Sequence, residues 1–382
     1  MNYSAPWWLP GGNLQTIWAA LRARRFSGVS PVFRRERWTT PDDDFVDVDW
    51  LIDAPTLLTS CSSLPPEGAG LSRGGPAWRP DASTLATSCS SLPLEAAGLS
   101  PSGPAWRRDA FALSRPLLVV FHGLEGSSAS HYAEALADAA RWRGWACAVP
   151  HFRSCSGEIN DAPRAYHSGD FEEIDWMLRR FKAQHTGPLL AVGVSLGGNA
   201  LMRWAGEMGV SAGAVVRGIA SVCSPLDLTA SGEAIGRGFN RLVYTPMFLR
   251  TMVPKALQKL DQHPGLFSRE ALLAARNLYQ FDDIFTAPLH GFKSAADYWA
   301  RASAKPHLRH IGVPALALNA RNDPFVPASS LPKSGDISRC VTLWQPVQGG
   351  HVGFPSAPFP GHVRAMPRAV TGFLAAQLQT QE

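Results

Sequence analysis

The stretch that most constrains the fold is "AVGVSLGGNALMRW", residues 191–204, where a serine stands between two glycines as a strand gives way to a helix. Upstream, "GPLLAVGV" is typical of a short buried strand. Downstream, Leu196, Leu201 and Trp204 can share one helix face. Glycine is unfavourable inside either element, so glycines clustered at the junction indicate a backbone conformation or close approach that other residues do not allow. The chain is therefore expected to make a tight strand-to-helix turn at Ser195.

Strand and helix patterns alternate on both sides of this turn. Most of the expected strands are apolar throughout, which favours a mostly parallel sheet with helices on both faces. The "DFVDVDWL" stretch instead alternates like a half-buried strand, and Asp170 and Glu173 are placed as a capping box at a helix start. The expected strands are 44–51, 115–121, 145–150, 188–194, 216–223, 313–320 and 340–347, and the expected helices are 130–145, 170–185, 196–209 and 362–378, the last beginning near Pro367.

Composition excludes few classes of function. The 382 residues could form one large domain or two modest ones, and the net charge of +5 is mild. Arginines gather between residues 22 and 37, where a solvated face beside a strand is favoured over contact with an anionic membrane surface. No nucleic-acid-binding signature accompanies them, so no nucleic-acid partner is expected.

The six cysteines contain no C-x-x-C pair, and His307 and His310 have no third ligand nearby, so no metal site is expected. No apolar run approaches the 18 or so residues needed to span a bilayer. The first 25 residues lack a basic start before an apolar run. These features predict a cytoplasmic protein.

A tandem duplication interrupts the pattern: "TSCSSLPPEGAGLSRGGPAWRPDA" begins at residue 59 and "TSCSSLPLEAAGLSPSGPAWRRDA" at residue 87. Two copies rich in Ser, Gly, Pro and Ala, without helical or strand periodicity, are typical of a flexible insertion rather than a solenoid. We expect residues 56–114 to be disordered and to lie outside the core.

The turn at Ser195 fits G-x-S-x-G between a strand and a helix, which is the nucleophile elbow of the α/β-hydrolase fold. A serine hydroxyl needs a base and an orienting acid, expected in the order serine, acid, histidine. Asp323 follows one buried strand and His351 follows the next. The long gap before Asp323 leaves room for a cap inserted after the strand that ends near Cys223.

An acyl-transfer site also needs backbone donors for the oxyanion. The His122-Gly123-Leu124 stretch ends the first strand after the insertion, so the N–H groups of Leu124 and Leu196 are the candidate donors. His122 precedes the serine and is interpreted as structural.

Seven segments together resemble the YheT-like family of α/β hydrolases: "PWWLPGGNLQTIW", "HGLEGSSASHY", "HFRSCSGEIND", "YHSGD", "GVSLGGNALMRW", "NARNDPFVP" and "GGHVGF". The resemblance implies an α/β-hydrolase fold over residues 1–382, with a helical cap after the sixth core strand, at about residues 225–305. It also implies an esterase-type serine hydrolase with Ser195, Asp323 and His351 as its triad. Relatives are linked to short-chain esters, acylglycerols or phospholipids, so a small-molecule or lipid ester is the expected partner.

The cap stretch 238–257 is rich in large apolar side chains. Most of them are expected to pack the cap on the core, while Met247 and Phe248, with Tyr166, are candidates for a substrate pocket. The acyl-transfer mechanism requires no cofactor. The rival hypothesis is a non-catalytic binding protein that kept the fold; dehalogenases and epoxide hydrolases fit less well because they carry aspartate at the elbow. The oligomeric state is left open.

Overall fold

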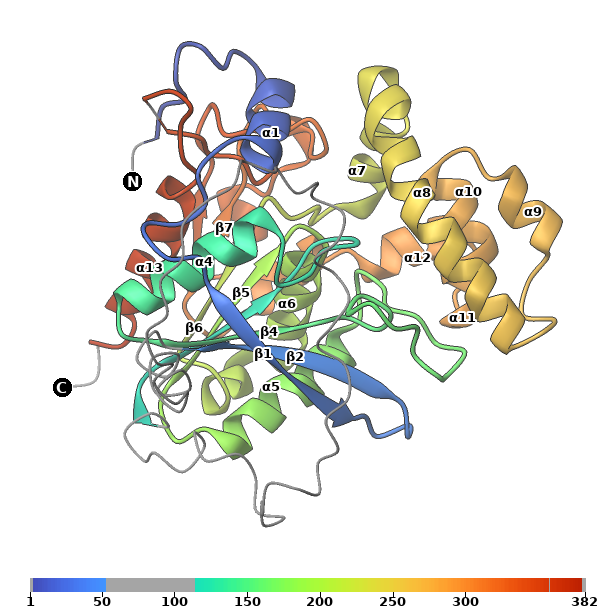
Figure 1. Ribbon diagram of the computed structural model, residues 1–382, viewed down its shortest axis with the longest axis horizontal. Helices are drawn as coiled ribbons and strands as arrows, with labels where there is room; N and C mark the ends of the chain where they lie inside the picture. The colour runs from blue at the N-terminus through green and yellow to red at the C-terminus, as the bar shows by residue number, and fades with distance from the viewer. Residues whose placement is uncertain (1–2, 53–113, 357, 380–382) are drawn as a thin grey trace, which may run out of the picture.

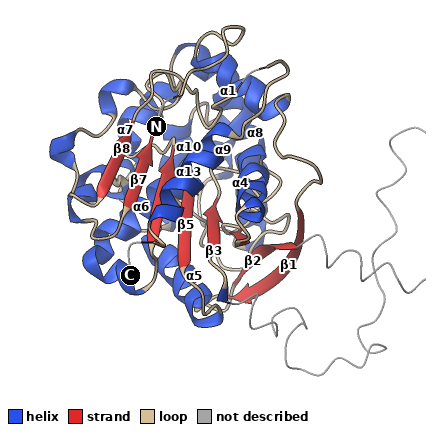
Figure 2. Ribbon diagram, turned by 90° about the vertical axis from the view of Figure 1, so that its left-hand side faces the viewer, coloured by secondary structure: helices blue, strands red, loops and turns tan. Residues whose placement is uncertain are grey.

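A computed structural model describes residues 3–52, 114–356 and 358–379. Its centre is an eight-stranded sheet in the order β1-β2-β4-β3-β5-β6-β7-β8 (Figure 2). The pairings of β1 with β2 and of β2 with β4 are antiparallel, and all the others are parallel, which confirms the mostly parallel sheet. The strands are β1 (Val32–Thr39), β2 (Phe45–Ile52), β3 (Leu117–Phe121), β4 (Ala146–Pro150), β5 (Leu189–Val194), β6 (Gly218–Val222), β7 (Ala315–Leu318) and β8 (Val341–Trp344).

Helices cover both faces of the sheet. Leu117, Val119 and Phe121 of β3 belong to the core shared with α5 and α6, whereas Leu118 and Val120 belong to the core shared with α4 and α13. This alternation explains why the central strands are apolar at every position. The helices of these two layers are α4 (His131–Trp142), α5 (Phe171–Gln184), α6 (Leu196–Met208) and α13 (Ala365–Ala376). Helix α1 (Gly12–Leu21) precedes the first strand, and the short helix η3 (Gly209–Ala214) follows α6.

Between β6 and β7 the chain forms a group of helices that stands to one side of the sheet, in yellow and orange in Figure 1. They are α7 (Leu228–Ile235), α8 (Gly238–Gln262), α9 (Arg269–Ala274), α10 (Leu278–Phe281), the π-helical η4 (Asp282–Thr286), α11 (Ala287–Leu289), α12 (Ala295–Ala302) and η5 (Lys305–His310). They occupy the span expected for the cap. Within the described ranges, no helix combines the length and apolar character that crossing a bilayer requires.

The N-terminal region contains two elements that sequence periodicity did not predict, α1 and β1. β1 pairs with β2 along its whole length, and Arg35 and Arg37 each donate to an aspartate of β2, at 2.8 Å from Asp49 and Asp47 respectively. Part of the basic stretch is therefore ion-paired across two strands. The duplicated insertion expected at 56–114 falls, apart from Ser114, outside the described residues.

The start of α5 departs from the predicted capping box. Asp170 Oδ1 accepts from the backbone N–H of Glu173 at 3.3 Å, as a helix cap should. The Glu173 carboxylate, however, accepts from the Arg153 guanidinium at 2.6 Å. Only half of the capping box forms, because a buried arginine takes the second carboxylate.

Arg153 is the centre of a buried ionic network. Its side chain is 2% exposed, and it donates to Asp42, Asp44 and Glu173 at 2.6–2.9 Å. These acids lie in the turn between β1 and β2 and at the start of α5. The network therefore joins the antiparallel edge of the sheet to a helix that covers one of its faces.

Replacing Arg153 with methionine should strongly destabilise the protein, because it leaves three carboxylates close together without their cation. Losing one partner of a buried ion pair costs about 3–5 kcal/mol. Urea unfolding followed by circular dichroism measures this. The control is Arg179→Met, which removes an exposed pair with Asp175 on α5 and should cost below about 1 kcal/mol. Equal midpoints for the two variants would contradict a stabilising role for Arg153.

Candidate active site

Ser195 lies in the single-residue turn between β5 and α6. Its backbone has φ 52° and ψ −118°, a conformation that non-glycine residues rarely adopt, and its N–H donates to Val222 O at 2.8 Å. The Ser195 side chain does not cap α6, although it occupies the N-cap position. The hydroxyl is therefore available for other partners.

The glycines around Ser195 are required by close packing. A Cβ on Gly197 would lie 2.5 Å from the carbonyl oxygen of His122 and 2.7 Å from that of Phe121, and one on Gly193 would lie 2.4 Å from Gly197 O. All of these neighbours are backbone atoms, which cannot move aside by changing rotamer. The glycines thus allow the start of α6 to pack directly against the end of β3.

The structure brings Ser195, His351 and Asp323 together. His351 Nε2 lies 3.0 Å from Ser195 Oγ, and His351 Nδ1 lies 2.9 Å from Asp323 Oδ2. A carboxylate only accepts hydrogen bonds, so Nδ1 carries the proton and Nε2 is left to accept from the serine hydroxyl. Asp323 Oδ1 also accepts from the backbone N–H of Phe325 at 2.8 Å, and the Asp323 side chain is fully buried.

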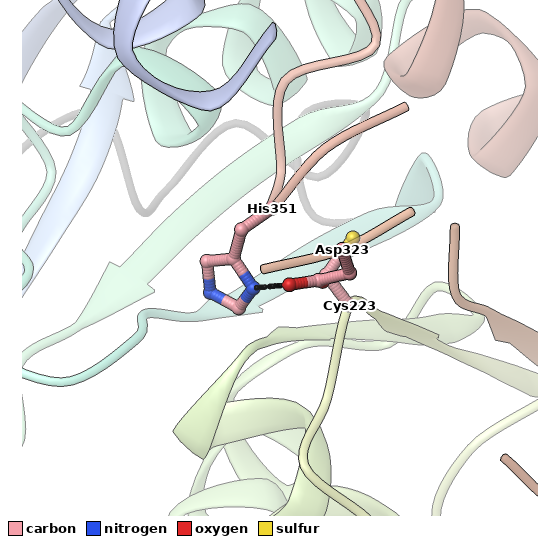
Figure 3. A group of neighbouring side chains, drawn as sticks. All are labelled: Cys223, Asp323 and His351. Atoms are coloured by element: carbon pink, nitrogen blue, oxygen red, sulfur yellow. Dashed lines mark hydrogen bonds and ion pairs between the residues drawn. The ribbon is translucent and has the colours of Figure 1, made fainter. Parts of the chain in front are cut away.

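Cys223 lies beside this pair, and its thiol, the Asp323 carboxylate and the His351 imidazole converge within 4.8 Å (Figure 3). Burial, followed by the charge of Asp323, raises the pKa of Cys223 well above its usual range, so the sulfur stays protonated. The imidazole and the carboxylate are joined by a hydrogen bond of 2.9 Å between His351 Nδ1 and Asp323 Oδ2. The group therefore fits a hydrogen-bonded support, in which Cys223 Sγ accepts from Val352 N–H at 3.2 Å.

The candidate oxyanion donors lie beside the serine. Within the described residues, the backbone N–H groups of Leu124 and Leu196 have no hydrogen-bond acceptor, and both residues line the cavity that contains Ser195. His122 is fully buried; its Nε2 accepts from Phe152 N–H at 3.0 Å, and burial lowers its pKa to about 3. A histidine held neutral in this way supports the donor loop, as the sequence interpretation of His122 proposed.

Two tyrosines hold the Leu124 loop in place. Tyr132 Oη accepts from Gly123 N–H at 2.8 Å. Tyr166 Oη accepts from Glu125 N–H at 3.0 Å and donates to the Glu125 carboxylate at 2.8 Å. Lys255 of α8 completes the arrangement with an ion pair to Glu125 at 2.9 Å. The donor loop is thus fixed from the core on one side and from the cap on the other.

The N-terminal helix α1 also supports the site, which periodicity did not indicate. Gln15 Oε1 accepts from Asn322 Nδ2 at 3.0 Å and from Gly349 N–H at 2.9 Å, and Thr16 Oγ1 accepts from His351 N–H at 2.8 Å. Both residues belong to the "PWWLPGGNLQTIW" segment. The adjacent polar side chains of Gln15 and Thr16, in a helix whose second half is apolar, were the available signal.

Two adjoining cavities lie between this site and the cap, and they share Leu124, Leu196, Met252, Asp282 and Tyr298. The cavity with Ser195 and His351 has a volume of about 110 Å³. Asp282 is its only acidic lining residue; it accepts from Trp299 Nε1 and Thr286 Oγ1, each at 2.7 Å, and burial raises its pKa to about 6.

Two of the three residues expected at the pocket line one of the two cavities, and the third lines neither. Phe248 lines the cavity with Ser195, and Tyr166 lines the adjoining cavity. Met247 is 45% exposed and is absent from the lining of both. The two neighbouring residues of α8 therefore face different surroundings, and Met247 is left out of the candidate pocket.

The sequence matches the model of the alpha/beta hydrolase fold family over residues 116–358. The chain belongs to this family. It is 39% identical over 250 residues to YheT of Escherichia coli (strain K12), whose name assigns it provisionally to the esterases; the match covers 64% of this chain and 72% of that one.

Two further members of this hydrolase family are more distant. Phospholipase ABHD3 of Mus musculus is 28% identical over 274 residues, covering 70% of this chain and 65% of the relative. The monoacylglycerol lipase of Saccharomyces cerevisiae is 28% identical over 251 residues, covering 63% of this chain and 55% of the relative. The chain thus matches about two thirds of the mouse protein and about half of the yeast protein.

Gly197→Ala should destabilise this family member, because its new methyl group would meet two backbone carbonyls of the β3 end. Overpacking of this kind costs about 1–3 kcal/mol. Differential scanning calorimetry measures the shift in Tm. Gly213→Ala is the matched control, since a Cβ there meets its nearest atom at 3.8 Å, an ordinary contact distance. An unchanged Tm for Gly197→Ala would mean that the elbow is not closely packed on β3.

Proposed function

We propose that the protein is a serine hydrolase of carboxylic esters. The observation that carries the proposal is the hydrogen-bonded chain from Ser195 Oγ through His351 to Asp323, with distances of 3.0 and 2.9 Å. Nucleophile, base and orienting acid are recognised by this geometry on any fold. Membership of the α/β-hydrolase family, together with relatives named as an esterase, a phospholipase and a monoacylglycerol lipase, supports the same reaction.

In the proposed mechanism, Ser195 Oγ attacks the ester carbonyl while His351 Nε2 takes its proton. The carbonyl oxygen becomes an oxyanion and accepts from the backbone N–H groups of Leu124 and Leu196. His351 then gives the proton to the leaving alcohol, and an acyl-serine ester remains. Water attacks this ester with His351 again as base, releasing the acid and regenerating Ser195. Asp323 holds the imidazole in the required tautomer throughout.

The cavity supports an apolar substrate part. Its lining is mostly apolar, and Asp282 is the only acidic side chain among its lining residues. An ester with an apolar acyl or alcohol portion fits such a lining better than a highly charged molecule. A monoacylglycerol or a phospholipid is the narrower proposal, in line with the names of two relatives.

A non-catalytic binding protein is the alternative. A binding role would not require the nucleophile, base, acid and two unpaired backbone donors to be arranged together around one cavity. A biotinylated alkyl fluorophosphonate, which reacts with an activated serine, separates the two functions. Labelling of Ser195 supports the hydrolase, and failure to label the folded protein supports the binding function.

Ser195→Ala and His351→Ala should each lower kcat on p-nitrophenyl butyrate by at least about 10³-fold, because each removes a group that acts in the bond-making step. Asp323→Asn should lose less, since it disturbs only the tautomer and orientation of His351. The kcat of each of the three variants is measured on protein whose Tm has been checked. Near-normal turnover by His351→Ala would refute its assignment as base.

Phe248→Ser should weaken turnover of long acyl chains selectively, because it replaces an apolar part of the cavity wall with a hydroxyl. We expect kcat/KM to fall about tenfold for p-nitrophenyl octanoate, the amount that a few methylene contacts contribute. The acetate ester is too short to depend on this wall and serves as the control substrate. Equal losses on both esters would show that Phe248 supports the fold rather than the acyl chain.

A further inference from the structure

Helix α8 has an inner face that reaches the candidate site. Tyr244, Phe248 and Met252 are spaced four residues apart and share one side of the helix. The Tyr244 hydroxyl lies 3.1 Å from the side-chain oxygen of Asn13 in α1, and its ring packs edge-on against Phe325 at a centroid distance of 4.6 Å. Phe248 and Met252 line the cavity that contains Ser195. This side accounts for part of the apolar composition of α8.

The opposite side of α8 is also apolar, yet it faces solvent. Four large apolar side chains within nine residues are exposed, and we call them the outer stripe: Phe239 (49%), Leu242 (78%), Val243 (38%) and Met247 (45%). Figure 1 shows α8 between α7 and α9, with its first turns rising beyond the other cap helices. The outward side of a surface helix is ordinarily polar, so a stripe of this kind indicates a binding surface.

The unpaired charged side chains in the first half of α8 are positive. Arg241 and Arg250 are exposed, and within the described residues neither is paired with an acidic side chain. Arg237, just before the helix, is paired with Glu233 at 3.0 Å. The only acidic residue of α8 is Asp261, at the far end of the helix. A partner of complementary chemistry therefore has negative charge above an apolar layer.

We propose that the outer stripe of α8 docks the protein on an anionic lipid surface. Phe239, Leu242, Val243 and Met247 enter the boundary between headgroups and acyl chains, while Arg250, which is three residues after Met247 and lies on the same side of the helix, contacts the lipid phosphates. Helices with an apolar face and flanking arginines bind membrane interfaces in this way. Two copies of the chain facing each other across the stripe would bring the two unpaired Arg250 side chains together, which disfavours a dimer at this surface.

The docking surface and the candidate site lie on opposite sides of the same helix. Docking through the outer stripe would hold the cavity beside the lipid from which an ester substrate would come. This consequence rests on the proposed function, whereas docking itself does not. Vesicle binding by the Ser195→Ala variant tests docking without turnover, so failure of one proposal can be told from failure of the other.

The experiment is sedimentation of the full chain with large unilamellar vesicles of phosphatidylcholine, with and without phosphatidylglycerol. The wild-type protein should bind the anionic vesicles, and the double variant Phe239→Asp/Leu242→Asp should bind at least about tenfold more weakly, because carboxylates at the interface lose apolar burial and are repelled by the lipid. Both residues are exposed, so Tm should stay near that of the wild type.

Val210→Asp is the matched control. Val210 is 83% exposed on η3, which follows the end of α6 that lies furthest from Ser195, and its replacement by aspartate adds one negative charge, as each substitution of the double variant does. It should leave vesicle binding unchanged. Arg250→Gln should weaken binding to anionic vesicles and reduce its sensitivity to salt.

Three outcomes would overturn the proposal. One is no sedimentation of the wild-type protein with anionic vesicles, and another is equal weakening by Val210→Asp and by the double aspartate variant. The third is a wild-type dimer in light scattering that the double variant converts to a monomer while vesicle binding is unaffected, because the stripe would then be an interface between copies.

Discussion

The turn at Ser195 is a strained backbone conformation on which the rest of the candidate site depends. Non-glycine residues in such regions cost about 1–3 kcal/mol each and persist only where the surroundings enforce them. Here the N–H of Ser195 is bonded to Val222 O, and Gly197 is closed against the carbonyls of Phe121 and His122. The central sheet therefore holds the serine hydroxyl in one position, and His351 and the backbone donors can be placed around it.

Backbone amides, rather than side-chain contacts alone, fix the loops around that serine. The N–H groups of Phe325, Gly349 and His351 are bonded to Asp323, Gln15 and Thr16 respectively. Each bond ties a loop at the carboxyl edge of the sheet to a buried polar atom. A helix from the start of the chain thus restrains loops that lie more than 300 residues later. An imidazole carried by a loop can in this way have a defined orientation before any substrate binds.

Local pattern was sufficient to predict the central strands and the turn at Ser195, and it indicated Asp323 and His351 as the candidate acid and base. It was insufficient where partners are remote in sequence. Nothing local indicates that Arg153 meets acids from two different elements, or that Glu173 would leave its capping role for that arginine. Met247 and Phe248 have different surroundings because they point to different sides of α8. Since α8 has apolar residues on both sides, its sequence does not show which side faces the cavity. Asp282 reaches the cavity only because the cap places η4 beside Ser195 and His351.

The connection between β2 and β3 has a consequence for how this chain can vary. β2 ends at Ile52 and β3 begins at Leu117, and both points lie at the edge of the sheet where the parallel strands start. Ser195 and the loops around it lie at the other edge, where those strands end. The closure entropy of a connecting segment grows only slowly with its length. A change in the length of this connection therefore acts on two attachment points at the edge of the sheet opposite the candidate catalytic residues, and it does not require the turn at Ser195 to move.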